Sequence, residues 1–165
     1  MPESTPMGDG GADTGHKHVK VLAGTASSGK PVYEVLPARH VDGDEYEMLG
    51  SPALAYGFAA GDVLRVAVDG SFEVMRRGGN LCLRVYPTTA LSSADVDALI
   101  AVFEPLGGLV ETPDDRRFVV ITMPVTSGFL PAEAAIGGWA ASHACEWEYG
   151  NVYDEDGEPV GWWAE

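Results

Sequence analysis

Basic residues are scarce in this chain of 165 residues, which has 10 Lys and Arg, only three of them lysine, against 25 Asp and Glu. The formal net charge at pH 7 is −15. Binding to the phosphate backbone of nucleic acids requires clustered basic side chains, so we expect no nucleic-acid partner. An acidic surface favours solubility, and it can also attract a protein partner with a basic surface.

Long apolar runs are absent, and cysteines are few. No run approaches the ~18 apolar residues that a membrane-spanning helix needs, and the first residues lack the basic and apolar regions of a secretory signal. We therefore expect no membrane partner and a cytoplasmic location. The only cysteines, Cys82 and Cys145, are too few for a disulfide framework and are expected to be small buried side chains.

The residue types that support catalysis are scattered. His143 and Cys145 are two residues apart, but a zinc site needs three or four converging ligands. A nucleophilic pair of His143 with Cys145 or Cys82 needs a third group that orients the base. We predict no metal, no cofactor and no catalytic residue, and the sequence leaves open whether His143 lies near either cysteine.

One segment resembles a phosphate-binding loop. Residues 24–30, GTASSGK, match the spacing G-x-x-x-x-G-K and follow a predicted strand. Such a loop needs a Ser or Thr after the lysine and a helix whose N-terminal amides face the phosphates. Here Pro31 follows, and then residues typical of a strand, so we predict a hairpin turn without nucleotide binding.

The first half of the chain, about residues 18–80, is predicted to be a small antiparallel β unit. Runs of branched and aromatic residues alternate with turn residues such as Asp69-Gly70 and Gly78-Gly79-Asn80. The strand at Leu81–Tyr86 follows the last of these turns. We expect it to be a central strand that serves both halves.

The second half, about residues 81–153, is predicted to be a ferredoxin-like βαββαβ unit, which makes the fold class α+β. We expect a helix from a Ser92 cap to Leu106 that buries a face formed by Val96, Leu99, Ile100 and Phe103. A second helix is predicted to begin at Pro131. The expected organisation is a disordered segment at 1–16, a single domain at 17–153 and an acidic tail containing tryptophan at 154–165.

Several short motifs together carry a family resemblance. They are Gly61-Asp62-Val63, Asp69-Gly70, residues 79–85 (GNLCLRV), Pro105-Leu106-Gly107 and Trp147-Glu148-Tyr149. In this order they resemble the bacterial family catalogued as domain of unknown function 4265, over about residues 19–152. The resemblance implies a one-piece domain in a bacterial cytoplasm, and it implies no catalytic residues.

The candidate binding residues are arginines and tryptophans on an otherwise acidic chain. Paired arginines can form a local site for a carboxylate or another anion. Adjacent tryptophans in a tail are expected either to fold back, with the tail acids over an arginine pair, or to anchor a partner. The candidates are Arg76, Arg77, Arg84, Arg116, Arg117, Trp147, Trp162 and Trp163.

Three glutamates in predicted strands have expected environments. Glu34 is expected to face solvent, or else to pair with Arg65 or Arg84. Glu146 and Glu148 alternate with aromatic residues and are expected to line the solvent face of an outer strand.

Two functions from different classes fit these observations. The first is a non-catalytic binding or interaction protein of an immunity, antitoxin-like or regulatory kind. The alternative is a small enzyme or small-ligand binder with a pocket between the two halves, lined by Trp139, Trp147 and the arginines.

Overall fold

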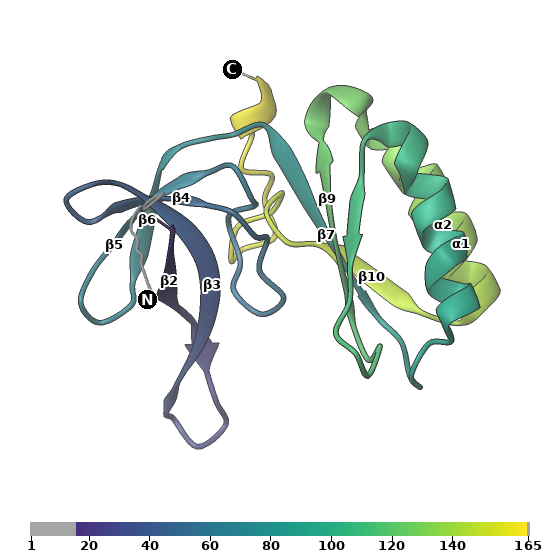
Figure 1. Cartoon of the computed structure of the whole chain (residues 1–165), viewed down its shortest axis with the longest axis horizontal. Coiled ribbons are helices and arrows are strands. Elements are labelled where there is room, and N and C mark those ends of the chain that lie inside the picture. Colours follow the sequence, from purple (N-terminus) through teal and green to yellow (C-terminus); the bar gives the residue numbers. More distant parts are fainter. Residues whose placement is uncertain (1–15, 165) are drawn as a thin grey trace, which may run out of the picture.

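The computed structural model describes residues 16–164 as an α+β structure with two antiparallel sheets and two α-helices (Figure 1). The helices cover the face of the four-stranded sheet that points away from the five-stranded sheet. Except for His16, the segment predicted to be disordered lies outside the described residues. In the part of the chain that is described, no helix has the length and apolar character to cross a membrane.

The five-stranded sheet is a meander with the strand order β2-β3-β4-β5-β6. Residues 26–30 form the tight turn of the first hairpin, as predicted, and the chain returns as a strand and not as a helix. The amide of Leu22 donates to the carbonyl of Gly70 at 2.8 Å, so the sheet curls until the turn after β5 meets β2. The strands are β2 (His16–Thr25), β3 (Pro31–Asp42), β4 (Glu45–Met48), β5 (Val63–Val66) and β6 (Phe72–Arg76).

The four-stranded sheet has the order β10-β7-β9-β8, and every pair in it is antiparallel. Two α-helices connect its strands. Short 3-10 turns follow α1, β9 and, later in the chain, β10. The elements are β7 (Asn80–Tyr86), α1 (Ser93–Phe103), η1 (Glu104–Leu106), β8 (Leu109–Glu111), β9 (Val119–Pro124), η2 (Val125–Ser127), α2 (Phe129–His143), β10 (Glu146–Tyr149) and η3 (Trp162–Ala164).

Helix α1 begins with the predicted cap. The Ser92 hydroxyl accepts from the Asp95 amide, and the Asp95 carboxylate accepts from the Ser92 amide, which satisfies two amides that have no partner within the helix. Three of the four residues predicted to be buried are in the core: Val96, Leu99 and Phe103. The prediction was wrong for Ile100, which lies at the margin of this stripe and is 41% exposed.

Helix α2 begins at Phe129, two residues before the predicted start at Pro131. Proline has no amide hydrogen to donate, and the first turn of a helix does not need one, so the ring is accommodated there. The helix ends at His143, where the following Ala144 adopts a left-handed conformation with φ of 52°.

Strand β7 is central in the four-stranded sheet, but it does not belong to the five-stranded sheet, so the prediction that it serves as a strand for both halves was wrong. The chain leaves β6 through Gly78, where a Cβ atom would lie 2.5 Å from the backbone of Gly61. This close crossing turns the chain out of the first sheet before β7 begins. The two halves meet through side chains of β7, Cys82 and Arg84 among them, which contact residues 52–59.

The C-terminal segment folds back onto the domain. The Trp162 side chain is buried in the core of the four-stranded sheet, and its indole N–H donates to the Asn151 carbonyl at 2.9 Å. The tail acids do not cover an arginine pair as predicted: Asp154 accepts from the amides of Asp156 and Glu158 within its own turn. Trp162 and its neighbour Trp163 therefore provide the apolar contact that holds this segment.

The two faces of α1 give a direct test of the core. We expect Phe103→Ala to lower the free energy of unfolding by about 3–5 kcal/mol, because the ring is fully buried and its loss leaves a cavity. The control is Ile100→Ala on the same helix, with an expected loss below about 1 kcal/mol because the side chain is partly exposed. Urea denaturation measures both, and equal losses would contradict the assigned packing.

Candidate functional site

The junction of the two halves is centred on Arg84. In β7 the residues Leu81, Leu83 and Val85 point to the helices, so the alternation of the strand directs Cys82 and Arg84 to the opposite face. The Arg84 side chain is only 1% exposed. A charge this deeply buried requires hydrogen-bonding partners on all sides.

Arg84 finds these partners in both halves. Its Nη1 donates to the carbonyls of Ala55 at 2.5 Å and Pro52 at 3.3 Å, and its Nη2 donates to Glu148 Oε2 at 3.2 Å. The guanidinium carbon lies 4.1 Å from the centre of the Tyr56 ring. Only Nε has no partner among the described residues.

The loop of residues 52–56 is held from its other side by Glu34. This carboxylate accepts from the amides of Ala53, Leu54 and Ala55 at 2.7, 3.0 and 2.9 Å. Both expectations for Glu34, exposure to solvent or pairing with Arg65 or Arg84, were wrong because backbone amides take both of its oxygens. Glu34 binds the amides and Arg84 binds the carbonyls, so the loop is fixed between opposite charges.

Glu148 on β10 completes the cluster. Its Oε2 accepts from Arg84, from the Tyr56 hydroxyl at 2.8 Å and from the Tyr86 hydroxyl at 2.5 Å. Glu146 faces solvent as expected, whereas Glu148 is 34% exposed and also reaches Arg84, which lies opposite it in the strand pairing.

The cluster holds Glu148 in its ionised form. Burial alone would raise the pKa of Glu148, but the hydrogen bonds from Tyr86 and Tyr56 and the Arg84 charge together lower it. The pKa values of Tyr56 and Tyr86 are raised, first by burial and then by their bonds to this carboxylate. Near neutral pH the cluster therefore contains a carboxylate, a guanidinium and two neutral phenols.

The cysteines and histidine do not form a nucleophilic pair in the described structure. Burial raises the pKa of Cys82 to about 12, and its thiol faces the Pro52 carbonyl. His143 stacks on Trp139 and lies 3.3 Å from an Asp95 oxygen, while the Cys145 thiol points to the His143 carbonyl and not to its ring. Over residues 16–164, no three His, Cys, Asp or Glu side chains converge as metal ligands.

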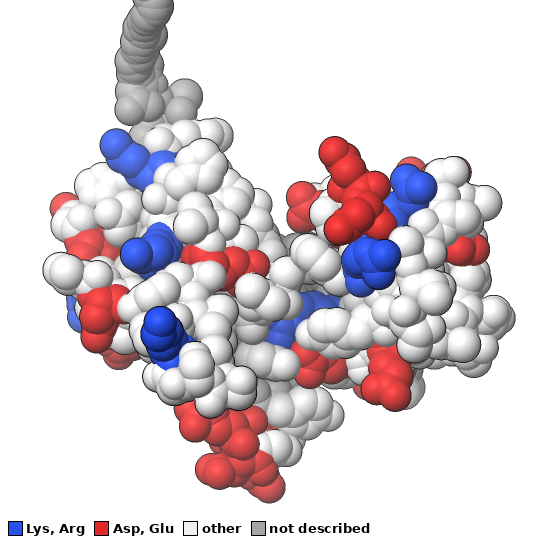
Figure 2. All heavy atoms as spheres, turned by 90° about the horizontal axis from the view of Figure 1, so that it is seen from below, with Lys and Arg blue, Asp and Glu red and all other residues white. Residues whose placement is uncertain are grey.

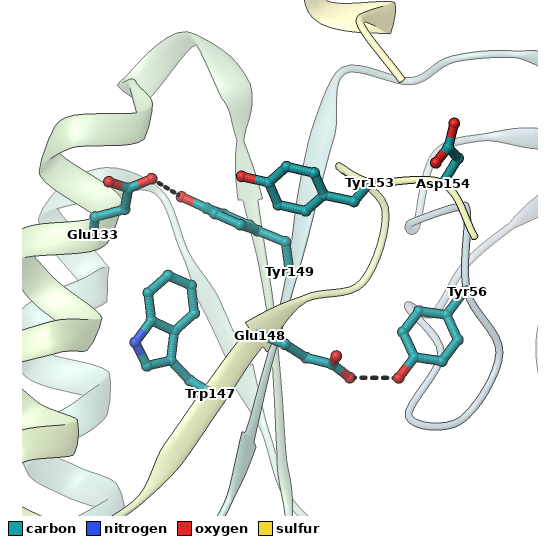
Figure 3. A pocket seen from close by; sticks show the side chains of 7 residues that line it. All are labelled: Tyr56, Glu133, Trp147, Glu148, Tyr149, Tyr153 and Asp154. Carbon is teal, nitrogen blue, oxygen red and sulfur yellow. Dashed lines mark hydrogen bonds between the residues drawn. The ribbon is translucent and has the colours of Figure 1, made fainter. Parts of the chain in front are cut away.

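A groove of about 500 Å³ runs along the edge strand β10 beside this cluster (Figure 3). We call it the acid–aromatic groove, because four aromatic side chains and three carboxylates line it and, among residues 16–164, no Lys or Arg does. In Figure 3 the Glu133 carboxylate accepts from the Tyr149 hydroxyl, and Glu148 accepts from Tyr56. The lining residues are Tyr56, Glu133, Trp147, Glu148, Tyr149, Tyr153 and Asp154.

A second cavity, of about 780 Å³, adjoins this groove and shares Tyr56, Tyr153 and Asp154 with it. Its other wall is the end of β2, from Leu22 to Thr25. The groove therefore continues from the β10 edge to the five-stranded sheet, along the line where the two halves meet.

The structure separates the predicted site residues into four places. Arg84 is at the centre of the junction, and Trp147 lines the acid–aromatic groove. Arg116 and Arg117 lie between β8 and β9, where Arg116 has a positive φ of 51° and donates through Nε to the Leu91 carbonyl. The remaining four, Arg76, Arg77, Trp162 and Trp163, line one cavity together.

Sequence reasoning missed Tyr56, Tyr153 and Glu133 as groove residues. They lie in a loop, in the segment after β10 and on α2, so no local spacing connects them. Only the pairing of β10 with β7 brings these three segments to one edge.

Comparison with known proteins gives a family and a fold but no activity. The model of a family described as a domain of unknown function, DUF4265, matches residues 34–139, which confirms the resemblance seen in the sequence motifs. The matched range contains Glu34, Tyr56 and Arg84 but ends before β10, and thus before Glu148. No curated protein matches the chain.

A solved structure shares the overall fold. It is the crystal structure of a hypothetical protein from Neisseria gonorrhoeae, with a TM-score of 0.64 and 11% sequence identity over 81% of this chain and 92% of that one. At this identity the likeness concerns the fold alone.

The Arg84 contacts predict a specific loss of stability. We expect Arg84→Met to lower the free energy of unfolding by about 3 kcal/mol, because two carbonyls and Glu148 lose their charged donor. The control is Arg117→Met, at an exposed position, which should change the free energy of unfolding by less than about 0.5 kcal/mol. Chemical denaturation of both variants is the measurement, and an Arg84→Met protein as stable as the native one would contradict this assignment.

The lowered pKa of Glu148 predicts a pH dependence with a definite sign. A carboxylate whose pKa is lower in the folded state stabilises the fold above its ordinary value of 4.5, and this contribution disappears as the pH falls through the lowered pKa. Glu148→Gln should therefore cost most near neutral pH and progressively less below 4.5. Glu146→Gln is the control for the loss of an exposed carboxylate from the same strand. A Glu148→Gln cost that stays constant with pH is the contrary result.

Proposed function

We propose that this chain, which belongs to the family described as domain of unknown function DUF4265, is a non-catalytic binding protein that holds a cationic group of a protein partner in its acid–aromatic groove. The observation that carries the proposal is the lining of that groove. Aromatic faces attract cations, and adjacent carboxylates add a direct charge interaction.

The negative charge in the groove is available to a partner. Glu133 and Asp154 are exposed, and neither forms an ion pair with a basic side chain within residues 16–164. Glu148 stays ionised, but the buried Arg84 guanidinium, 3.2 Å away, offsets its charge. A lysine or arginine of a partner would thus meet two uncompensated carboxylates between aromatic rings.

The charge of the whole chain supports the same kind of partner. The net charge of −15 increases the rate at which a basic surface meets this protein. On the face shown in Figure 2, Lys and Arg lie in small separate groups among Asp and Glu, without the continuous basic stripe that nucleic-acid binding uses. We therefore propose a protein partner with a basic surface.

We propose that the chain covers a basic surface of its partner, as an immunity, antitoxin-like or regulatory protein would. The cytoplasm is the compartment we propose, because the family resemblance implies it. A bacterial setting agrees with the family resemblance.

The alternative of a small enzyme or small-ligand binder has its own support. Cavities lie at the junction between the two halves, where such a pocket was expected. Its expected lining was only partly right: Trp139 is buried between the helices, with its indole N–H on the Asp95 carbonyl. The high pKa of Cys82, which burial causes, favours binding over catalysis.

We also propose that residues 80–149 form a ferredoxin-like half. The support is the order β10-β7-β9-β8 with antiparallel pairs and a helix in each of the two crossovers. In this arrangement the last strand, β10, is an edge strand, and the groove lies along it.

A binding experiment with a charge-matched control tests the groove. The probe is a fluorescently labelled hexa-arginine peptide, and the readout is fluorescence anisotropy at constant ionic strength. The double variant Glu133→Gln/Asp154→Asn removes two charges. It keeps an acceptor oxygen for the Tyr149 hydroxyl and another for the backbone amides of residues 156 and 158. We expect it to weaken binding about fivefold or more, as the loss of two ion pairs at a partly enclosed site.

The control is Asp97→Asn/Glu104→Gln, which removes the same charge from exposed positions on α1 and η1. We expect it to leave the dissociation constant within about twofold, since screened surface charges act weakly at a distance. Equal weakening by both double variants would mean that the peptide responds only to net charge, and the groove would then have no specific role.

A further inference from the structure

A cavity of about 700 Å³ lies between the end of β6 and the short helical turns η2 and η3. Figure 1 shows η2 and η3 at the same end of the molecule, beside the start of β7. The cavity brings together residues 74–79, residues 125–126 and the two adjacent tryptophans of the C-terminal segment. It shares only Arg77 with the cavity that adjoins the acid–aromatic groove.

The charge of this cavity is opposite to that of the protein as a whole. Arg76 and Arg77 line it, and no carboxylate among residues 16–164 does. Arg76 is exposed and forms no ion pair with an acid within the described residues. Within this part of the chain its guanidinium therefore has its charge and donors available for a ligand.

Arg77 is held in place by contacts behind the cavity. Its Nη1 donates to the Gly57 carbonyl at 2.8 Å and lies 3.5 Å from Asp62 Oδ2. Asp62 is 1% exposed, and it is fixed by the amides of Ala59 and Gly78 at 3.0 and 2.7 Å. The position of Arg77 is thus set before any ligand arrives, which lowers the entropic cost of binding.

The tryptophans give the cavity an apolar wall made of two rings that stand nearly perpendicular to each other. The Arg77 guanidinium lies 5.5 Å from the centre of the Trp162 ring, and the two indoles stand at 81° with their centres 5.5 Å apart. Val74 and Val125 extend the apolar lining. An anion alone would leave this wall unused, whereas an aromatic ring attached to the anion would pack against it.

We propose that this cavity is a second binding site, specific for an anion that carries a flat aromatic group, such as an aromatic carboxylate. The carboxylate pairs with Arg76, and the ring packs against Trp163 and the Trp162 edge. The site takes a ligand of opposite charge to that of the acid–aromatic groove and does not depend on it.

Titration with benzoate tests the proposal, with the four indole N–H signals of the chain as the readout in nuclear magnetic resonance. Benzoate should shift the Trp162 and Trp163 signals and leave those of Trp139 and Trp147 in place. Acetate, which has the charge without the ring, should bind at least about fivefold more weakly, because it buries no aromatic surface. Benzylamine, with the ring and the opposite charge, should not shift Trp162 or Trp163.

Arg76→Gln is the variant that removes the free charge from an exposed position, so the fold should be retained. We expect benzoate binding to weaken by about tenfold, as for the loss of one charge-assisted contact. Arg117→Gln removes an exposed arginine elsewhere and should leave binding unchanged. Unchanged binding in Arg76→Gln, equal weakening in Arg117→Gln, or equal binding of acetate and benzoate would each overturn the proposal.

A free aromatic acid and a peptide that ends in an aromatic residue present the same chemistry. A parallel titration with acetyl-Gly-Phe distinguishes these sources. Tighter binding of the peptide would assign the site to a protein C-terminus, and tighter binding of benzoate would assign it to a small molecule. Failure of both ligands to shift either indole would overturn the proposal without affecting the groove.

Discussion

A buried guanidinium is tolerated only where its charge and its donors are satisfied, and Arg84 obtains its partners from both halves of the molecule. The carbonyls of residues 52 and 55 come from the first half, and the Glu148 carboxylate comes from the last strand. The position of one half relative to the other follows from this requirement. Gly150 completes the fit, because a Cβ atom there would lie 2.9 Å from the Cys82 sulfur.

Both proposed sites depend on this junction. The acid–aromatic groove needs Tyr56 next to β10, and Tyr56 stays there because Glu34 and Arg84 hold its loop from two sides. The cavity lined by Arg76, Arg77, Trp162 and Trp163 needs the C-terminal segment folded against the end of β6, and the buried Trp162 keeps the segment there. Each proposed site is assembled from segments that are distant in sequence. Two sites of opposite charge can thus lie on one small acidic protein.

Local patterns in the sequence predicted the elements well and the site poorly. Alternating and helical spacings identified the strands and both helices, and Ser92 marked the start of the first helix within one residue. The errors concern long-range contacts. Glu148 reads as a solvent residue because alternation cannot show that Arg84 lies opposite, and Glu34 reads as exposed because its partners are backbone amides. The tail tryptophans were recognised as unusual from their size alone, but only the fold shows what they pack against.

The bond between Tyr56 and Glu148 joins residues 92 positions apart. During synthesis the first half leaves the ribosome before β10 is made. Until then the Tyr56 hydroxyl lacks its Glu148 partner and faces water. Contacts of such separation slow folding, because the chain loses much entropy before it gains them. Any binding at the β10 edge consequently requires that β10 has been made and paired, so a nascent or truncated form without this strand would not engage a partner there.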